Sequence, residues 1–252
     1  MTRTQYTVIT GASSGIGYEL AKSYVRRGKN VIVAARRADR LERLKHEIAE
    51  IDPEADVVIR EVDLANADGA VSFYNSLGNY HITTWVNNAG RGNKGDITAA
   101  DLDTDLDMLH INIDAVAILS SLYIRDYKDV DGAVLVNISS IGGYLMVPGA
   151  TLYCASKFFV SALTEGINHE MVANGHALRA KVMAPTTTES AFEQVANDLP
   201  EQVDYRKLDR PFHTAAEMAT YILQLAESDK VVGEIDFATR ELKLSDPHHP
   251  HL

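Results

Sequence analysis

The chain has 252 residues, of which 46% are hydrophobic and 23% are charged, and its formal net charge is −11. This length and apolar content suffice for one α/β domain with a sizeable core. The acidic balance argues against a nucleic-acid surface, although a locally positive pocket can still bind an anionic ligand. A single cysteine, Cys154, cannot form a disulfide within the chain, and we expect neither a signal peptide nor a membrane-spanning segment. We therefore expect a cytoplasmic protein.

Strand-like and helix-like segments alternate along the chain. Short apolar runs predict strands at Tyr6–Thr10, Val31–Ala35, Val57–Val62, Thr84–Val86, Ala133–Ile138, Ala180–Ala184 and Glu234–Phe237. Helical patterns between them lie at Tyr18–Arg27, Arg37–Ile51, Ala67–Leu77, Leu102–Tyr127, Phe158–Ala173 and Ala215–Glu227. About seven parallel strands with helices on both faces predict a single doubly wound, Rossmann-type α/β domain over residues 1–252.

A glycine-rich turn follows the first predicted strand. Its residues are Thr10, Gly11, Ala12, Ser13, Ser14, Gly15, Ile16 and Gly17. Gly11 allows a tight turn, Gly15 lets a pyrophosphate approach the backbone, and Gly17 lets the helix and the strand pack closely. The following helix would present free N–H groups and a partial positive charge to phosphates. The turn therefore predicts a dinucleotide site to which Ser13 and Ser14 add hydroxyl donors.

The end of the second predicted strand carries Arg36 and Arg37 where an NAD site often has an acidic residue. An arginine binds a 2′-phosphate through two hydrogen bonds, whereas a carboxylate repels it. This pair favours NADP(H) over NAD(H). The alternative, that the arginines are the solvated start of the next helix, applies more to Arg37 than to Arg36.

Tyr153 and Lys157 lie four residues apart, about one helical turn, at the start of a helix-like stretch. A tyrosine hydroxyl beside an ammonium group is a candidate proton donor with a lowered pKa. Hydride transfer to a ketone builds negative charge on the carbonyl oxygen, which needs a proton donor and a second hydrogen bond. Tyr153 and Ser140 are candidates for these two tasks.

Together, these motifs resemble those of the short-chain dehydrogenase/reductase family, and they occur in its order and at its spacing from about Tyr6 to Phe237. The matching segments are Thr10–Gly17, Asp63-Leu64, Asn87–Gly90, Asn112, Asn137–Ser140 and Tyr153–Lys157. The resemblance implies a carbonyl reductase or alcohol dehydrogenase.

Catalytic roles follow from that resemblance. It implies that Tyr153 is the general acid/base and that Lys157 lowers its pKa and binds the nicotinamide ribose. Ser140 would polarise the substrate carbonyl, with Ser139 as a less favoured alternative. Asn112 would hold a water in a proton relay, unless it is a buried helix asparagine that bonds backbone.

Cofactor contacts are implied in the same way. Asp63 and the Leu64 backbone would contact the adenine, although Asp63 can also be read as a strand-end cap. Further contacts are implied at Asn88, Ala89, Gly90, Pro185, Thr186 and Thr188, the last through its backbone to the nicotinamide carboxamide.

The chain departs from the family pattern at two places. Thr186 replaces the glycine that usually follows the proline, which places the nicotinamide or substrate pocket in doubt. Asp236–Arg240 stands where a Gly-Gly pair is often found, which places closure of the substrate site by the C-terminus in doubt.

Thr186–Phe212 is the longest stretch without periodicity, and we expect it to be the substrate loop (residues 186–212). Candidate pocket residues are Phe192, Val195, Leu199, Tyr205, Tyr144 and Met146. An apolar lid packed on the domain explains them equally well. The polar tail, residues 245–252, is expected to be mobile; its histidines show no metal-ligand pattern, and we expect no metal site.

Two other functions remain open. A cofactor-binding regulatory protein without turnover would not need the Ser140, Tyr153 and Lys157 set, and an epimerase or dehydratase of this fold usually has a different glycine spacing. The helices Leu102–Tyr127 and Phe158–Ala173 are long and apolar, and the resemblance implies that they pair across a two-fold axis. We therefore expect a homodimer or homotetramer that acts on a small-molecule substrate.

Overall fold

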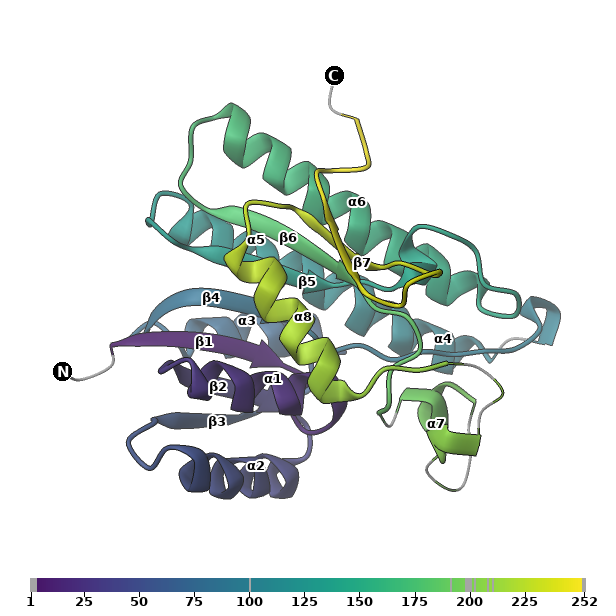
Figure 1. The fold of residues 1–252 in the computed structure, drawn as a ribbon, viewed down its shortest axis with the longest axis horizontal. Helices are drawn as coiled ribbons and strands as arrows, with labels where there is room; N and C mark the ends of the chain where they lie inside the picture. Colours follow the sequence, from purple (N-terminus) through teal and green to yellow (C-terminus); the bar gives the residue numbers. More distant parts are fainter. Residues whose placement is uncertain are drawn as a thin grey trace.

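The computed structural model describes residues 4–99, 101–190, 192–197, 201, 203–207, 209 and 211–250. These residues form one sheet with the strand order β3-β2-β1-β4-β5-β6-β7-β8 (Figure 1). The strands are β1 Gln5–Thr10, β2 Asn30–Ala35, β3 Val57–Glu61, β4 His81–Asn87, β5 Val134–Ile138, β6 Arg179–Ala184, β7 Val232–Ile235 and β8 Leu242–Ser245. Neighbouring strands from β3 to β7 run parallel, and β8 pairs antiparallel with β7. The doubly wound α/β fold is confirmed.

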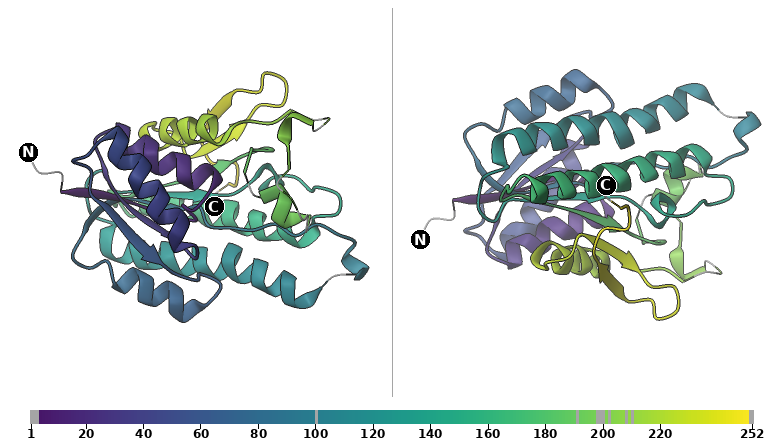
Figure 2. Two further views of the ribbon diagram at one scale, coloured as in Figure 1. Left: turned by 90° about the horizontal axis from the view of Figure 1, so that it is seen from below. Right: turned by 90° about the horizontal axis from the view of Figure 1, so that it is seen from above.

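Helices cover both faces of the sheet (Figure 2). One apolar cluster packs α1 Gly15–Arg26, α2 Ala38–Ile51 and α8 Ala215–Glu227 on one face. The other face carries α3 Ala67–Asn75, α5 Ala115–Tyr127 and α6 Thr151–Ala173. Successive residues of β1, Val8 and Ile9, belong to opposite clusters, because side chains alternate across a strand. This double burial explains why the inner strands are continuous apolar runs.

The C-terminal segment differs from the prediction. The last parallel strand, Val232–Ile235, begins and ends two residues earlier than the predicted strand Glu234–Phe237. Strand β8 was not predicted. In the tail, the backbone N–H groups of His248 and His249 donate to the buried Glu165 carboxylate at 2.5 and 2.8 Å. The expected mobile tail therefore makes specific contacts as far as these residues.

The predicted long helix Leu102–Tyr127 has three parts. These are α4 Leu102–Leu109, a π turn His110–Asp114 (η2) and α5. By length and mean hydropathy alone, Leu102–Tyr127 could cross a membrane, although the core helix of a soluble protein passes the same test. The expected absence of a membrane-spanning segment therefore stays a prediction. In the fold, Leu119 and Tyr123 of this helix pack against the sheet.

The carboxyl ends of β1, β4, β5 and β6 lie at one end of the sheet, and the strand order reverses direction between β1 and β4. In an open parallel sheet, a crevice forms at such a point because the following loops diverge to opposite faces. The described parts of the substrate loop include a short helix, α7 Phe192–Ala196, beyond this end of the sheet, and a 3₁₀ turn, Tyr205–Lys207 (η4) (Figure 1). It is therefore less irregular than its sequence indicates.

Candidate active site

A cleft of about 520 Å³ runs along the carboxyl ends of the strands. Its lining extends from Arg36 and Asp63 at one end to Ser140 and Tyr153 at the other. Every predicted catalytic or cofactor-binding residue lines it except Gly17 and Asn112. This volume lies within the usual range for a small-molecule or cofactor site.

The glycine turn forms the floor of the cleft. Gly11 and Gly15 have φ values of +67° and +58°, a left-handed conformation that strains other residues. A Cβ atom on Gly17 would lie 2.5 Å from the Asn88 Nδ2 atom. Asn88 in turn donates from Nδ2 to the Thr10 carbonyl at 2.8 Å, which ties the end of β4 to the turn. The close approach that the motif predicts is therefore present between the turn and β4.

Positive charge gathers at one side of this turn. The Arg37 guanidinium donates from Nη2 to the Ser13 and Ser14 hydroxyls at 2.9 and 3.0 Å. Arg36 also lines the cleft and is exposed at the end of β2. The structure thus joins Arg37, which sequence reasoning ranked second, to the turn. Asp63 lines the cleft too, while its carboxylate accepts the Ala65 N–H as a local cap.

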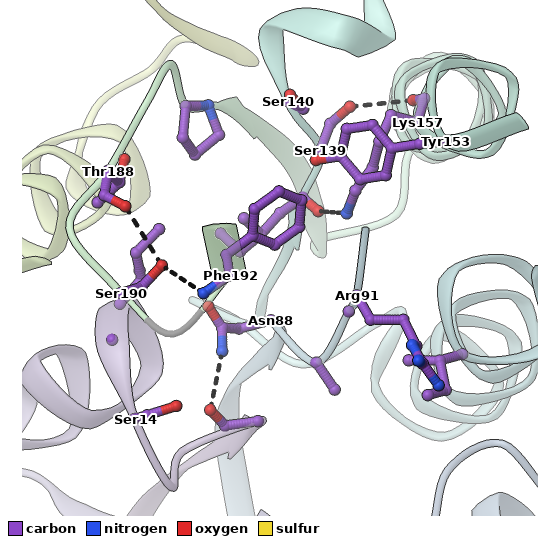
Figure 3. A pocket seen from close by; sticks show the side chains of 18 of the residues that line it. Ser14, Asn88, Arg91, Ser139, Ser140, Tyr153, Lys157, Thr188, Ser190 and Phe192 are labelled. Atoms are coloured by element: carbon purple, nitrogen blue, oxygen red, sulfur yellow. Dashed lines mark hydrogen bonds between the residues drawn. The ribbon is translucent and has the colours of Figure 1, made fainter. Parts of the chain in front are cut away.

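Tyr153 and Lys157 project from the first two turns of α6. Lys157 is buried, and its Nζ atom donates to the Ile138 carbonyl at 2.9 Å and lies 5.9 Å from the centre of the Tyr153 ring. Burial lowers the pKa of the Lys157 ammonium group to about 8. The helical spacing therefore places both side chains at the same end of the cleft (Figure 3).

The two neighbouring serines have different environments. Ser139 is buried, donates to the Lys157 carbonyl at 3.0 Å and pairs with the Ser161 hydroxyl at 2.8 Å. The Ser140 hydroxyl accepts the Gly142 N–H at 3.1 Å and lines the cleft, so its proton is available for donation. This placement favours Ser140 as the substrate donor and gives Ser139 a structural task.

Asn112 lies in the π turn and is fully buried. Its Oδ1 accepts the Arg91 N–H at 3.1 Å, and its Nδ2 donates to the Arg91 carbonyl at 3.0 Å and to the Ser156 hydroxyl at 3.0 Å. The side chain thus fixes the loop that follows β4 and also contacts α6. It bonds backbone, as the structural alternative predicts; the relay role stays a prediction.

A third wall comes from the segment after β6. Pro185, Thr186 and Thr188 line the cleft. Hydrogen bonds continue from this wall toward α7: Ser190 Oγ donates to the Thr188 carbonyl at 3.2 Å, and the Phe192 N–H donates to Ser190 Oγ at 3.2 Å. The Phe192 ring then lies beside Tyr153, with 5.4 Å between ring centres (Figure 3).

The substrate-side candidates fare unevenly. Phe192 lines the cleft, whereas Tyr205 is buried within the loop, where its hydroxyl donates to the Ser190 carbonyl at 3.1 Å. Tyr144 points instead to Glu165, to which its hydroxyl donates at 2.6 Å, and Met146 is 58% exposed outside the lining. The Val195 side chain and Leu199 lie outside the described residues.

Sequence reasoning missed several lining residues. These are Arg91, Lys94, Ile111, Ile141, Val147 and Ala150. Ile141, Val147 and Ala150 lie between Ser140 and Tyr153, and this bracketing by two motif residues was an available signal. Arg91 and Lys94 follow the Asn87–Gly90 motif in the sequence, and the Arg91 guanidinium lies 3.6 Å from the Asp107 carboxylate.

Comparisons with known proteins agree with this arrangement. A family model described as short chain dehydrogenase matches residues 5–200. An uncharacterized oxidoreductase of Staphylococcus saprophyticus is 27% identical, over 91% of this chain and 94% of that protein. A short-chain dehydrogenase from Sphingobium yanoikuyae in complex with NADPH superposes with a TM-score of 0.83 at 23% identity, covering 93% of this chain and 89% of the other. A short chain dehydrogenase/reductase from Burkholderia phymatum in complex with NAD gives 0.78 at 20% identity, with 92% and 88% covered.

Proposed function

Because the chain belongs to the short-chain dehydrogenase/reductase family of oxidoreductases, we propose that it interconverts a ketone or aldehyde and an alcohol with NADP(H). One observation carries the proposal: a single cleft joins the glycine turn and Arg37 to Ser140, Tyr153 and Lys157. A dinucleotide bound along this cleft would bring its phosphates to the turn and its nicotinamide to Tyr153.

The residues present fit a dinucleotide. A Cβ atom at Gly11 would meet the Ala89 Cα at 2.8 Å, so this position of the turn tolerates no side chain, and Gly11 itself lines the cleft. Ser14, which precedes α1, makes no side-chain cap to the helix, so it leaves first-turn N–H groups for phosphate. The preference for NADP(H) rests on Arg36 and Arg37, which form the positive edge where a 2′-phosphate would lie.

The bound cofactor would supply or accept the hydride. In the reductive direction, the Tyr153 hydroxyl would give its proton to the substrate oxygen as negative charge develops there. Ser140 would donate a second hydrogen bond to the same oxygen. The Lys157 ammonium, held by the Ile138 carbonyl, would stabilise the tyrosinate that remains. Phe192, which lies beside Tyr153, would exclude water from the reacting groups.

A panel of ketones, aldehydes and alcohols, assayed with both cofactors by the absorbance of the reduced nicotinamide, tests the reaction. We expect turnover of at least one substrate and a loss of about 10²–10⁴-fold in Tyr153→Phe. Tyr153→Phe should still bind NADPH, which separates loss of chemistry from loss of the site. NADPH binding without turnover of any substrate would instead support a regulatory protein.

Cofactor choice is tested separately by fluorescence titration with NADPH and NADH. We expect tighter binding of NADPH, and we expect Arg37→Ala to weaken NADPH binding by about tenfold while NADH binding changes little. Tighter binding of NADH to the unaltered protein would contradict the arginine argument.

We also propose that the chain acts in the cytoplasm as a homodimer or homotetramer. Support for self-association comes from α4 and α6, which expose Leu102, Leu106 and Val172 at 68%, 41% and 54%. Exposed apolar side chains on helices of this length favour a helical interface between copies. Cell fractionation would test the location, since Leu102–Tyr127 also passes a length test for a membrane helix.

A further inference from the structure

A buried histidine, His213, connects the cleft wall to the C-terminal hairpin. It directly precedes Thr214, which begins α8 with a reciprocal cap: Thr214 Oγ1 accepts the Glu217 N–H and the Glu217 carboxylate accepts the Thr214 N–H. Helix α8 packs in the core against α1, so His213 stands on a rigid support. Its side chain is 5% exposed and does not line the cleft.

The His213 backbone holds the wall from one side. Its N–H donates to the Thr187 carbonyl at 3.0 Å, and its carbonyl accepts the Glu189 N–H at 2.8 Å. These two bonds bracket Thr188, which pairs with His213 as an isolated parallel bridge. The segment that would face the nicotinamide is therefore held by the entry to α8.

The His213 ring contacts Thr186 and Arg240, one residue from each segment that departs from the family pattern. Its Nε2 lies 2.9 Å from the Arg240 carbonyl, and its Nδ1 lies 3.3 Å from Arg240 Nη2 and 3.4 Å from the Thr186 hydroxyl. A carbonyl only accepts and a guanidinium only donates, so Nε2 carries the proton and Nδ1 accepts. These partners therefore fit one tautomer of the imidazole ring.

Arg240 has a φ of +65°, the left-handed conformation that favours glycine. A contact that offsets this strain explains why a bulky residue stands there. Arg240 contributes that contact with both its carbonyl and its guanidinium. The two unusual side chains, Thr186 and Arg240, therefore converge on one imidazole nitrogen, although each lies 27 residues from His213 in the chain.

We propose that His213 is a positioning residue that fixes Thr186–Thr188 for the nicotinamide half of the cofactor, and that Thr186 and Arg240 act through it as a pair. The proposal rests on the proposed function, because the cofactor defines what the wall positions. Hydrogen bonds from Thr188 through Ser190 to Phe192 extend the effect to the ring beside Tyr153.

The first experiment compares two ligands on His213→Phe, which keeps a flat ring without nitrogens, and on His213→Gln, which keeps one donor and one acceptor. We expect His213→Phe to weaken NADPH binding by about tenfold or more, with partial recovery in His213→Gln. Binding of 2′,5′-ADP, which lacks the nicotinamide half, should stay unchanged in both variants. Unchanged NADPH affinity in His213→Phe, or an equal loss for both ligands in both variants, overturns the proposal.

The second experiment is a double-mutant cycle between Thr186→Val, which removes the hydroxyl at constant shape, and Arg240→Asn, which tolerates a positive φ. We expect each single variant to weaken NADPH binding severalfold and the double variant to weaken it less than the product, because both act on one nitrogen. Arg27→Asn is the matched control: Arg27 pairs with Glu227 of α8, away from the hairpin, and should combine independently with Thr186→Val. A cycle in which Thr186→Val and Arg240→Asn also act independently overturns the proposal.

Failure of the proposed function is distinguishable from failure of this inference. If the unaltered protein binds neither NADPH nor NADH, the proposed function fails. The same cycle is then measured by thermal unfolding without ligand. Non-additive shifts in midpoint temperature support the His213 joint, and additive shifts overturn it.

Discussion

Lys157 is buried, although its proposed role requires a positive charge. It is 6% exposed, and its ammonium group donates a hydrogen bond to the Ile138 carbonyl at 2.9 Å. Desolvation penalises the charged form, which is why its pKa falls to about 8. The folded protein therefore carries a cost for this charge near neutral pH, and a bound cofactor would offset part of it.

The pH dependence of stability checks this cost. A lysine with a lowered folded pKa releases its proton first in the folded state, so stability rises with pH between the folded and unfolded pKa values, from about 8 to 10.5. Relative to Lys157→Met, the free energy of unfolding of the unaltered protein should rise by up to roughly 3 kcal/mol over this range. Denaturant titrations of both proteins at several pH values measure the difference.

Lys181 is a control that separates the burial cost of a lysine from a role in the cleft. Its pKa is also lowered to about 8 by burial, but it donates to the Ser228 and Lys230 carbonyls, away from the cleft. Lys181→Met should keep activity, whereas Lys157→Met should lose it. A stability difference that does not change with pH would contradict the assigned burial cost of Lys157.

The Phe192 ring occupies the substrate side of the cleft, so a substitution there tests which substrates can enter. Its ring lies 5.4 Å from the Tyr153 ring and also fills the space beside Gly92, where a Cβ would meet Phe192 Cζ at 2.5 Å. Phe192→Ala should open this side of the cleft, raise KM for small ketones severalfold and admit bulkier ones, while NADPH affinity stays nearly unchanged. Steady-state kinetics on a size-graded ketone series measures the shift. Identical size preference in both proteins would remove Phe192 from the substrate pocket.

At the scale of elements, the start of α1 couples two parts of the site. A Cβ on Gly15 would lie 2.7 Å from the Ser190 Cβ, so the phosphate turn and the substrate-loop entry are in close contact. Loop movements near Ser190 are therefore limited by the turn, which links cofactor binding to the position of Phe192.

Gly15→Ala tests this coupling, and Gly28→Ala is its control. Both glycines have positive φ values, but a Cβ on Gly28 would meet nothing within 4 Å. Each variant should lose about 1 kcal/mol of stability through backbone strain. Only Gly15→Ala should also weaken NADPH binding, by about tenfold or more. Equal affinities in the two variants, measured by fluorescence titration, would argue against a functional contact at Ser190.

Elements differ in how well the sequence predicts them, for physical reasons. The inner strands are buried on both faces, so their apolar runs identify them, and the Tyr153–Lys157 spacing locates α6. Strand β8 was missed because Leu242–Ser245 is short and half exposed. The π turn His110–Asp114 interrupts the helix without breaking its alternation of apolar and polar residues, so the sequence pattern does not reveal it. The joint of Thr186, His213 and Arg240 depends on long-range contacts that no local pattern encodes.

At the scale of the whole molecule, α4 to α6 form an extended helical layer on one face of the sheet (Figure 2). Fewer than half of the residues in the most apolar window of Leu102–Tyr127 are buried, 44%. Sedimentation velocity should therefore show a dimer or tetramer, and Leu106→Glu should shift the distribution toward monomer. A control, Val71→Glu, replaces a side chain of similar exposure, 37% against 41%, on the same face of the sheet but on α3 rather than on α4–α6. Monomer at all concentrations of the unaltered protein would contradict the proposed assembly.

The eighth strand has a consequence for how copies can join. It leaves β3 and β8 as the two edges of the sheet, and each edge carries charge. Strand β3 carries Arg60 and Glu61, and β8 carries Lys243, which pairs with Glu234 of β7. Unpaired edge groups invite another strand, and short, charged edges discourage it. Continuous sheets shared between copies, and fibrous aggregates built in the same way, are thus disfavoured on both sides of the molecule, even when the protein is concentrated and without ligand.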